Sequence, residues 1–150
     1  MTDPITQSMM QGAAGAGGSG EYIDNIFSTY LWRGTGSAIT VNNGLDLSGE
    51  GGMVWVKQRD GNSDHNIVDT ARGVSAGRLR ANNASNESGT NYVASITSTG
   101  FVTGTDSDVT SSANKFVSYS FRKAPGFFDV ITYTGNGVAG RTVDHNLGSV

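Results

Sequence analysis

The sequence predicts an all-β fold, an antiparallel jelly-roll sandwich preceded by a short N-terminal helix or extended anchor and a glycine-rich linker. After residue 20, apolar and polar residues alternate with the period of two that is typical of half-buried strands. Glycine accounts for 22 of the 150 residues, about twice its usual share of roughly 7%. Gly and Asn supply the positive φ angles of tight turns, and many short strands separated by turns favour a sandwich.

Composition limits the classes of protein to which the chain can belong. Hydrophobic residues make up 36% and charged residues 15% of the sequence, which is too apolar and too weakly charged for a disordered chain. The length suits one domain with a core. A net charge of -3 gives no basic face for nucleic acid, and no apolar run approaches the roughly 20 residues that span a bilayer. We therefore expect no nucleic-acid partner and no membrane insertion.

Cysteine is absent, which excludes a disulfide framework and a thiolate metal site. This composition fits a protein folded in a reducing cytoplasm. The first 20 residues lack the basic and apolar regions of a secretory signal. If the protein acts outside a cell, we expect another route of release, such as the lysis that frees assembled virions.

The first 20 residues differ from the rest of the chain. Asp3 and Pro4 are residue types typical of an N-cap and a first helical position, and the spacing of Ile5, Met9 and Ala13 predicts one apolar helical face. An isolated helix of fewer than about 12 residues is marginal in water. Two interpretations stay open, a floppy terminus or an anchor peptide, tethered by a glycine linker, that becomes ordered on a partner. The predicted tail-anchoring residues are Pro4, Ile5, Met9, Met10 and Ala13.

Short strands are expected throughout the remaining sequence. The pattern predicts them at residues 26–33, 38–41, 53–59, 66–69, 79–81, 92–96, 101–102, 116–122 and 127–134. Asn43-Gly44 is a type I′ hairpin signal, and Asp60-Gly61-Asn62 indicates another turn. We expect these stretches to bury their aromatic and branched side chains between paired sheets.

Two of these strands have distinctive patterns. Met53 and Trp55 lie on one face of the strand at 53–59 and Val54 and Val56 on the other. A strand that is apolar on both faces lies inside a sandwich or against a neighbouring subunit, so these four residues are predicted to pack in an oligomer. The strand at 116–122 has the cleanest alternation. Its two faces are Val117, Tyr119 and Phe121 against Ser118, Ser120 and Arg122.

An internal similarity suggests the domain boundaries. Residues 30–36 and 40–45 are echoed by residues 133–137 and 142–148, an offset of about 100 residues that suits a whole sandwich domain. We expect an anchor and linker at 1–20, a sandwich at 21–126 and the start of a second, truncated β unit at 127–150. On this interpretation the natural protein continues beyond Val150.

No cofactor, metal or catalytic site is expected. Residues 60–64 begin like a calcium loop, but His65 and Ala71 stand where Gly and Glu are required, so a solvated turn is favoured. A weak calcium site at a loop tip, near Asp106 and Asp108, stays open. The two histidines lie in separate turns, no nucleophile motif accompanies them, and the acidic residues are scattered. We therefore expect the protein not to be an enzyme.

Aromatic residues raise the possibility of sugar binding. Exposed rings of Trp32, Trp55, Tyr92 and Tyr119 could stack on sugars, but each lies in an alternating apolar strand, which favours the core. Asp69 and Arg72 are interpreted as a structural ion pair in a turn.

Four motifs in order resemble a known family. They are Gly51-Gly52-Met53-Val54-Trp55-Val56-Lys57, Asp69-Thr70-Ala71-Arg72-Gly73, Thr99-Gly100-Phe101 and the segment from Phe116 to Lys123. Together, over roughly residues 26–123, they resemble a module of bacteriophage tail fibres and other virion structural proteins, notably of marine and cyanobacterial phages. That module is similar to concanavalin A-like or laminin G-like jelly rolls, which include lectins, adhesion modules and some glycanases. No catalytic pair of that fold maps onto the chain, so the resemblance implies structure and adhesion without hydrolysis.

The resemblance leads to three hypotheses of function. The first is the N-terminal region of a phage tail fibre, made in the host cytoplasm and located in the virion tail. Residues 1–20 would dock on tail or neck proteins such as an adaptor or nozzle, and analogy with such fibres implies a homotrimer. The alternative is a lectin-like, carbohydrate-binding module that contacts host surface glycan. The third, a glycan depolymerase, requires a carboxylate pair about 5 to 9 Å apart.

Overall fold

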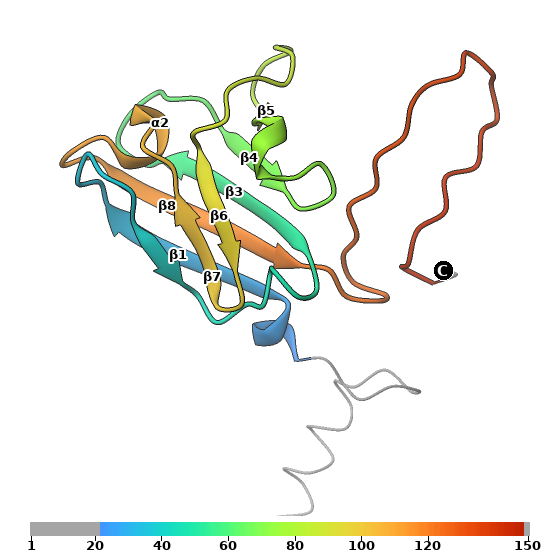
Figure 1. Cartoon of the computed structure of the whole chain (residues 1–150), viewed down its shortest axis with the longest axis horizontal. Helices are drawn as coiled ribbons and strands as arrows, with labels where there is room; N and C mark the ends of the chain where they lie inside the picture. The colour runs from blue at the N-terminus through green and yellow to red at the C-terminus, as the bar shows by residue number, and fades with distance from the viewer. Residues whose placement is uncertain (1–21, 149–150) are drawn as a thin grey trace, which may run out of the picture.

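A computed structural model describes residues 22–148 as two antiparallel sheets that pack face to face (Figure 1). One sheet has five strands in the order β1-β8-β3-β4-β5, and the other has three in the order β2-β7-β6. The strands are β1 (Phe27–Arg33), β2 (Thr40–Asn42), β3 (Gly52–Gln58), β4 (Asn66–Asp69), β5 (Leu79–Arg80), β6 (Val93–Thr97), β7 (Gly100–Thr103) and β8 (Lys115–Arg122). The predicted all-β antiparallel sandwich is confirmed at this level.

Short helices connect some of the strands. The 3-10 turns η1 (Ile23–Asn25) and η2 (Val74–Ala76) precede β1 and β5, and α2 (Ser107–Thr110) joins β7 to β8. Asp106 caps α2 by accepting a hydrogen bond from the Asp108 N–H at 2.9 Å. No helix among residues 22–148 is long and apolar enough to cross a membrane.

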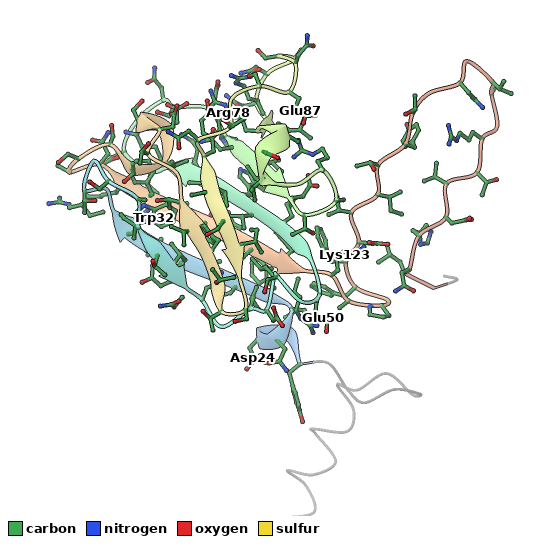
Figure 2. The ribbon with its side chains drawn as sticks, in the orientation of Figure 1. Asp24, Trp32, Glu50, Arg78, Glu87 and Lys123 are labelled. Atoms are coloured by element: carbon green, nitrogen blue, oxygen red, sulfur yellow. The ribbon has the colours of Figure 1, made fainter. Side chains whose placement is uncertain are left out.

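The core lies between the two sheets. Val54 and Val56 of β3 face it from the larger sheet, and Val41 of β2 and Phe101 of β7 face it from the smaller one. The other buried members are Leu45, Leu47, Val68, Tyr92, Val93, Val109 and Phe116. Trp32, labelled in Figure 2, packs against this core and donates its indole N–H to the Val109 carbonyl at 3.2 Å. The ring therefore ties β1 to the α2 segment.

Most predicted strands are present, and seven of them match the structure within one residue at each end. These are the segments predicted at 26–33, 53–59, 66–69, 79–81, 92–96, 101–102 and 116–122, which correspond to β1, β3, β4, β5, β6, β7 and β8. The strand predicted at 127–134 is not formed, because that part of the described chain has only an isolated bridge between Ala124 and Phe128. The pattern also missed α2, whose four residues are too few for a helical period.

The hairpin predicted at Asn43-Gly44 is not formed. β2 pairs with β7 and not with the next strand along the chain. The backbone N–H groups of Asn43 and Gly44 instead donate to the Thr99 carbonyl, and Gly44 has a φ of +85°. The turn directs Leu45 and Leu47 into the core, so a strong turn signal was correct about the turn and wrong about which strands it joins.

The burial expected for the aromatic face of β8 is wrong at Tyr119, whereas Val117 of that face is buried. Ser118 and Ser120 are fully buried, whereas Tyr119 is 37% exposed. The cause is register, since Val56 and Val54 lie opposite these serines and belong to the core face. The aromatic face of β8 therefore points to the outside of the larger sheet.

Candidate functional site

The outer face of the five-stranded sheet is rich in apolar side chains. Strand alternation places them opposite the core face, and none belongs to the buried core cluster. We define the outer face by Phe27, Leu31, Met53, Trp55, Ile67, Leu79, Val117, Tyr119 and Phe121. One register row crosses all five strands through Thr29, Tyr119, Trp55, Ile67 and Leu79. The row is apolar from β8 to β5, and Thr29 of β1 is its polar end.

Two aromatic side chains form the centre of this face. The Trp55 and Tyr119 rings meet edge to face, with centroids 6.0 Å apart. The Trp55 indole N–H donates to Nδ1 of His65 at 3.2 Å, so the imidazole fixes the orientation of the indole. Tyr119 is exposed and Trp55 is half-buried, which places two oriented rings at the surface.

A second aromatic group lies at the end of the sheet where β1 begins and β8 ends. The Phe27 and Phe121 rings lie 4.9 Å apart, and Phe128 stacks on Phe121 at 5.1 Å with an interplanar angle of 26°. Phe128 comes from the segment after the sandwich. The outer face is therefore continuous with the start of the C-terminal segment.

The outside of the smaller sheet provides a contrast within the same molecule. Thr40 and Asn42 of β2 and Ser95 of β6 are exposed there, and Val102 of β7 is half-buried. An antiparallel sheet commonly covers the core with one face and meets water with a polar one. The smaller sheet follows this rule, whereas the larger sheet is apolar on both faces.

Residues 127–148 form a long segment, which we call the C-terminal loop, that projects from the sandwich (Figure 1). Its two ends meet at the base, where Gly126 N–H donates to the Asn146 carbonyl at 3.2 Å and Asn146 N–H donates to Asp129 Oδ2 at 3.1 Å. Tyr133 is 66% and Val138 68% exposed. Loops of more than about 12–15 residues without secondary structure are usually functional or linkers.

A pocket of about 270 Å³ lies at the base of this loop. Its lining residues are Glu50, Lys123, Ala124, Pro125, Phe128, Asp129 and Asn146. Figure 2 labels Glu50 and Lys123 beside the base. The Lys123 ammonium lies 2.8 Å from Asp129 Oδ1, and this contact, together with the Asn146 N–H, holds the pKa of Asp129 below its ordinary value. A general acid needs a raised pKa, so this carboxylate is suited to a structural role.

Charged residues gather at the opposite end of the sandwich, near Arg78 and Glu87 in Figure 2. Arg78 is buried, donates to Asp108 Oδ2 at 2.5 Å and to the Asn66 side chain, and lies 4.1 Å from the Tyr92 ring centroid. Arg72 and Asp69 form the expected ion pair at 2.6 Å. These contacts attach the loops to the sandwich.

The acidic residues considered for calcium are engaged with protein donors. Asp60 accepts from the Lys115 N–H at 3.0 Å, and Asp64 Oδ2 accepts from Arg80 Nε at 2.9 Å. Asp106 caps α2 and Asp108 contacts Arg78. Within the part of the chain that is described, no group of three or more His, Asp or Glu side chains is arranged to hold a metal ion.

The structure separates the four residues predicted to pack in an oligomer. Val54 and Val56 are at most 1% exposed and belong to the chain's own core. Met53 and Trp55 are half-buried on the outer face. Only this second pair offers surface to another subunit, because two sheets of the same chain already cover the first pair. Oligomer packing itself stays a prediction.

The predicted anchoring residues lie outside the described residues. Pro4, Ile5, Met9, Met10 and Ala13 belong to this group. Among the aromatics considered for sugar binding, Tyr92 is 7% exposed and Trp32 packs against the core, as the core interpretation requires. That interpretation is wrong for Tyr119, which is 37% exposed on the outer face.

Comparison with known proteins gives a family assignment. Residues 23–150 match the model of a domain of unknown function, DUF7483. The chain belongs to the DUF7483 family. No curated protein and no solved structure matches it. The DUF7483 match begins just before β1 and extends through the C-terminal loop, so the family unit is larger than the sandwich alone.

Sequence reasoning missed most of the outer face. Leu31 and Ile67 were placed in strands without an assigned role, and the face of β8 was expected to be buried. A useful signal was present in β3, where both alternating faces are apolar. Such a pattern predicts that both faces of the sheet are covered, one by the core and the other by something beyond the described sandwich.

Proposed function

We propose that this chain is a non-catalytic assembly module, and that the outer face of its larger sheet packs against other subunits of a virion structure. The observation that carries this proposal is the continuous apolar row centred on Trp55 and Tyr119. Contiguous exposed apolar surface is typical of interaction sites in soluble proteins. Burying it removes roughly 25 cal/mol of unfavourable hydration free energy per Å².

The narrower form of the proposal is the N-terminal region of a bacteriophage tail fibre. It is supported by the four motifs at residues 51–57, 69–73, 99–101 and 116–123, which resemble those of phage virion proteins. In this proposal a short N-terminal helix within residues 1–20 attaches the fibre to tail or neck proteins, and the sandwich is a jelly roll. Three copies would associate through their outer faces in the virion tail.

Substitutions on the outer face test the assembly role. In the full-length chain, Leu31→Ser combined with Tyr119→Ser should weaken self-association at least tenfold in sedimentation velocity. Both side chains are exposed, so the variant should keep the circular dichroism spectrum of the sandwich. Val102→Ser, on the outside of the smaller sheet, is the matched control and should change association less than twofold. Unchanged association of the double variant would contradict the proposal.

Deleting residues 1–20 tests the anchoring role separately. In a phage that encodes the protein, the deletion should abolish incorporation into virions without changing the amount of folded protein in lysates. Normal incorporation would remove the N-terminal anchor from the proposal. The experiment also tests the virion assignment, because a protein absent from wild-type particles cannot be a tail component.

Carbohydrate binding is the second candidate function, and the oriented pair of rings on the outer face favours it. Aromatic rings that are fixed and exposed can stack on the apolar face of a sugar. Glycan-array binding by the full-length chain, lost in Trp55→Ala and kept in Trp32→Phe, would support this candidate.

A glycan depolymerase is the third and least supported candidate, because Asp129 in the pocket forms an ion pair with Lys123. Release of reducing sugar ends from a host polysaccharide, lost in Glu50→Gln, would support it.

A further inference from the structure

We propose that the first part of the C-terminal loop, Val130 to Thr134, adds as a strand to the free edge of β1 in a second copy of this chain. This inference rests on the proposed assembly function and specifies one contact through which copies would join. The proposed strand addition uses the backbone groups of a sheet edge, whereas packing through the outer face uses side chains. The two contacts can therefore be tested independently.

The first observation is the unprotected edge of the larger sheet. Among residues 22–148, β1 is the terminal strand of that sheet and pairs only with β8 over its seven residues, without a register shift. Its sequence contains no proline, and its only charge is Arg33 at the end. Natural edge strands are usually blocked by proline, inward-pointing charges, bulges or shortness, because a free edge recruits other strands. β1 has none of these devices along its length.

The hydrogen-bond pattern identifies the free backbone groups of this edge. Arg122 N–H donates to the Ile26 carbonyl at 2.8 Å, and Gly34 N–H donates to the Asn114 carbonyl at 2.9 Å. Even-numbered residues of β1 thus point their backbone groups toward β8, since the pattern alternates in an antiparallel pair. Thr29 and Leu31 consequently direct their N–H and carbonyl groups outward. Both residues are exposed.

The second observation is a strand-forming sequence without a strand partner. Val130 to Thr134 reads Val-Ile-Thr-Tyr-Thr, five successive residues of the types enriched in strands. The structure nevertheless forms no strand in this segment. Ile131 is 39% and Tyr133 66% exposed, and alternation would put these two side chains on one face. Paired with β1, that face would extend the outer face beyond Leu31.

The position of the loop favours an edge from another copy. Glu50, in the connection between β2 and β3, lines the pocket at the loop base together with Asp129. In the strand order β1-β8-β3, the base therefore lies toward β3, across β8 from the free edge of β1. Figure 1 shows the loop running away from β1. The hydrogen bonds of Asn146 and the Lys123–Asp129 pair hold it in that direction.

Proline variants of the full-length chain test both sides of this contact. In an antiparallel ladder, the loop residues that share a face with Thr29 and Leu31 direct their N–H groups toward β1. Tyr133→Pro therefore removes a ladder donor from the loop, and Thr29→Pro removes an outward N–H from β1 that β8 does not use. Each should weaken self-association at least tenfold in sedimentation velocity while keeping the circular dichroism spectrum and cooperative unfolding. Val138→Pro, an exposed position of the same loop outside the segment, is the control and should change association less than twofold.

Mixing the two variants gives a second readout. A Thr29→Pro copy keeps an intact loop and a Tyr133→Pro copy keeps an intact edge, so an equimolar mixture should form a one-to-one complex. Wild-type chains that stay monomeric at all concentrations, or a mixture that stays monomeric, would overturn the inference. If the outer-face double variant loses association and both proline variants keep it, the assembly proposal stands and the strand addition is wrong. If only the proline variants lose association, the strand addition stands and the outer face is not a contact between copies.

Discussion

Ser118 and Ser120 occupy the centre of the core face of β8, between side chains of β1 and β3. Ser118 lies opposite Tyr30 on one side and Val56 on the other, and Ser120 lies opposite Val54. Their small size leaves room for these neighbours between tightly packed sheets. Among the described residues, neither hydroxyl finds a hydrogen-bond partner. These two positions therefore combine good packing with an unfavourable buried polar group.

Replacing the second serine should stabilise the protein. A buried hydroxyl without a partner costs about 1–3 kcal/mol, and Ser120→Ala removes it with almost no change of volume. We expect a free energy of unfolding about 1 kcal/mol higher, measured by urea denaturation. Thr110→Val is the comparison, since the Thr110 hydroxyl donates to the Ser37 carbonyl at 2.6 Å, and it should lose about 1 kcal/mol. A clear loss of stability in Ser120→Ala would contradict this account.

Gly104 illustrates a second constraint on single residues. A Cβ at this position would lie 1.7 Å from the Asn91 carbonyl oxygen, which belongs to the backbone. Gly104→Ala should therefore force the β7 end away from the β6 start and cost about 3 kcal/mol or more in thermal or urea unfolding. Gly135→Ala, in the C-terminal loop, meets nothing within 4 Å and should change stability by less than about 0.5 kcal/mol. Equal effects of the two substitutions would show that the close approach of the Asn91 carbonyl to Gly104 does not determine the loss of stability.

At the scale of elements, residues 81–90 form an exposed loop that polar contacts hold against the sandwich. Asp64 Oδ1 accepts from the side-chain amides of Asn82 and Asn83, both at 2.9 Å, and its other oxygen pairs with Arg80. The Asn82 hydrogen bond and the Arg80 contact hold the pKa of Asp64 below its ordinary value. The ionised carboxylate is thus the form that the folded loop prefers.

The pH dependence of stability follows from this direction. Because the Asp64 pKa is lower in the folded than in the unfolded chain, its contribution is complete above the ordinary value of 3.8 and is lost as pH falls through the lower folded value. The pKa values of Asp46, Asp60 and Asp129 are shifted in the same direction. We expect the melting temperature to fall below about pH 3.8 and amide exchange of residues 81–90 to accelerate there.

The variant Asp64→Asn measures how much of the acid effect on residues 81–90 comes from the Asp64 carboxylate. Asp64→Asn should reduce the acid-induced acceleration of exchange in residues 81–90, since the titrating group is gone. Asp144→Asn, on the exposed C-terminal loop, should leave it unchanged. A melting temperature that rises as pH falls below 4 in the wild-type chain would contradict the direction of the shifts.

The sequence predicted elements better than it predicted their faces. β1, β3, β4 and β8 were placed within one residue because apolar alternation is a local property. The buried side of a strand depends on its register with neighbours that lie far along the chain, such as β3 beside β8. The aromatic side of β8 was therefore assigned wrongly to the interior. For the same reason the outer face could be foreseen only in β3, where both sides are apolar.

The partner of a turn is also a non-local property. Asn43-Gly44 makes a turn, but the strand that follows crosses to the other sheet. Residues 127–134 were expected to form a strand because their apolar residues alternate, and alternation does not show whether a partner strand lies within reach. In the whole molecule, such a mismatch between local preference and described structure indicates either a strained segment or one that pairs with another chain.

The geometry of the whole molecule gathers its connections at one end. Residues 22–26 enter beside the point where β8 leaves, because Arg122 Nε donates to the Asn25 carbonyl at 2.6 Å and its N–H to the Ile26 carbonyl. The chain therefore enters and leaves the sandwich on the same side. The rest of the sandwich, with its outer face and free edge, projects from these connections. Such an arrangement lets copies associate laterally without interrupting the chain.

The same geometry predicts that the C-terminal loop is dispensable for folding. The buried core cluster contains no residue beyond Phe116, and the loop contributes mainly the Phe128–Phe121 stack and the Lys123–Asp129 pair. Ending the chain after Gly126 should lower stability by about 1–2 kcal/mol, which corresponds to roughly 4–8 °C in melting temperature. The truncated chain should unfold cooperatively by circular dichroism and calorimetry. A truncated chain without a cooperative transition would mean that the folded unit includes the loop, as the extent of the DUF7483 match allows. Folding and association would then depend on the same segment, and point variants such as Tyr133→Pro would be needed to separate them.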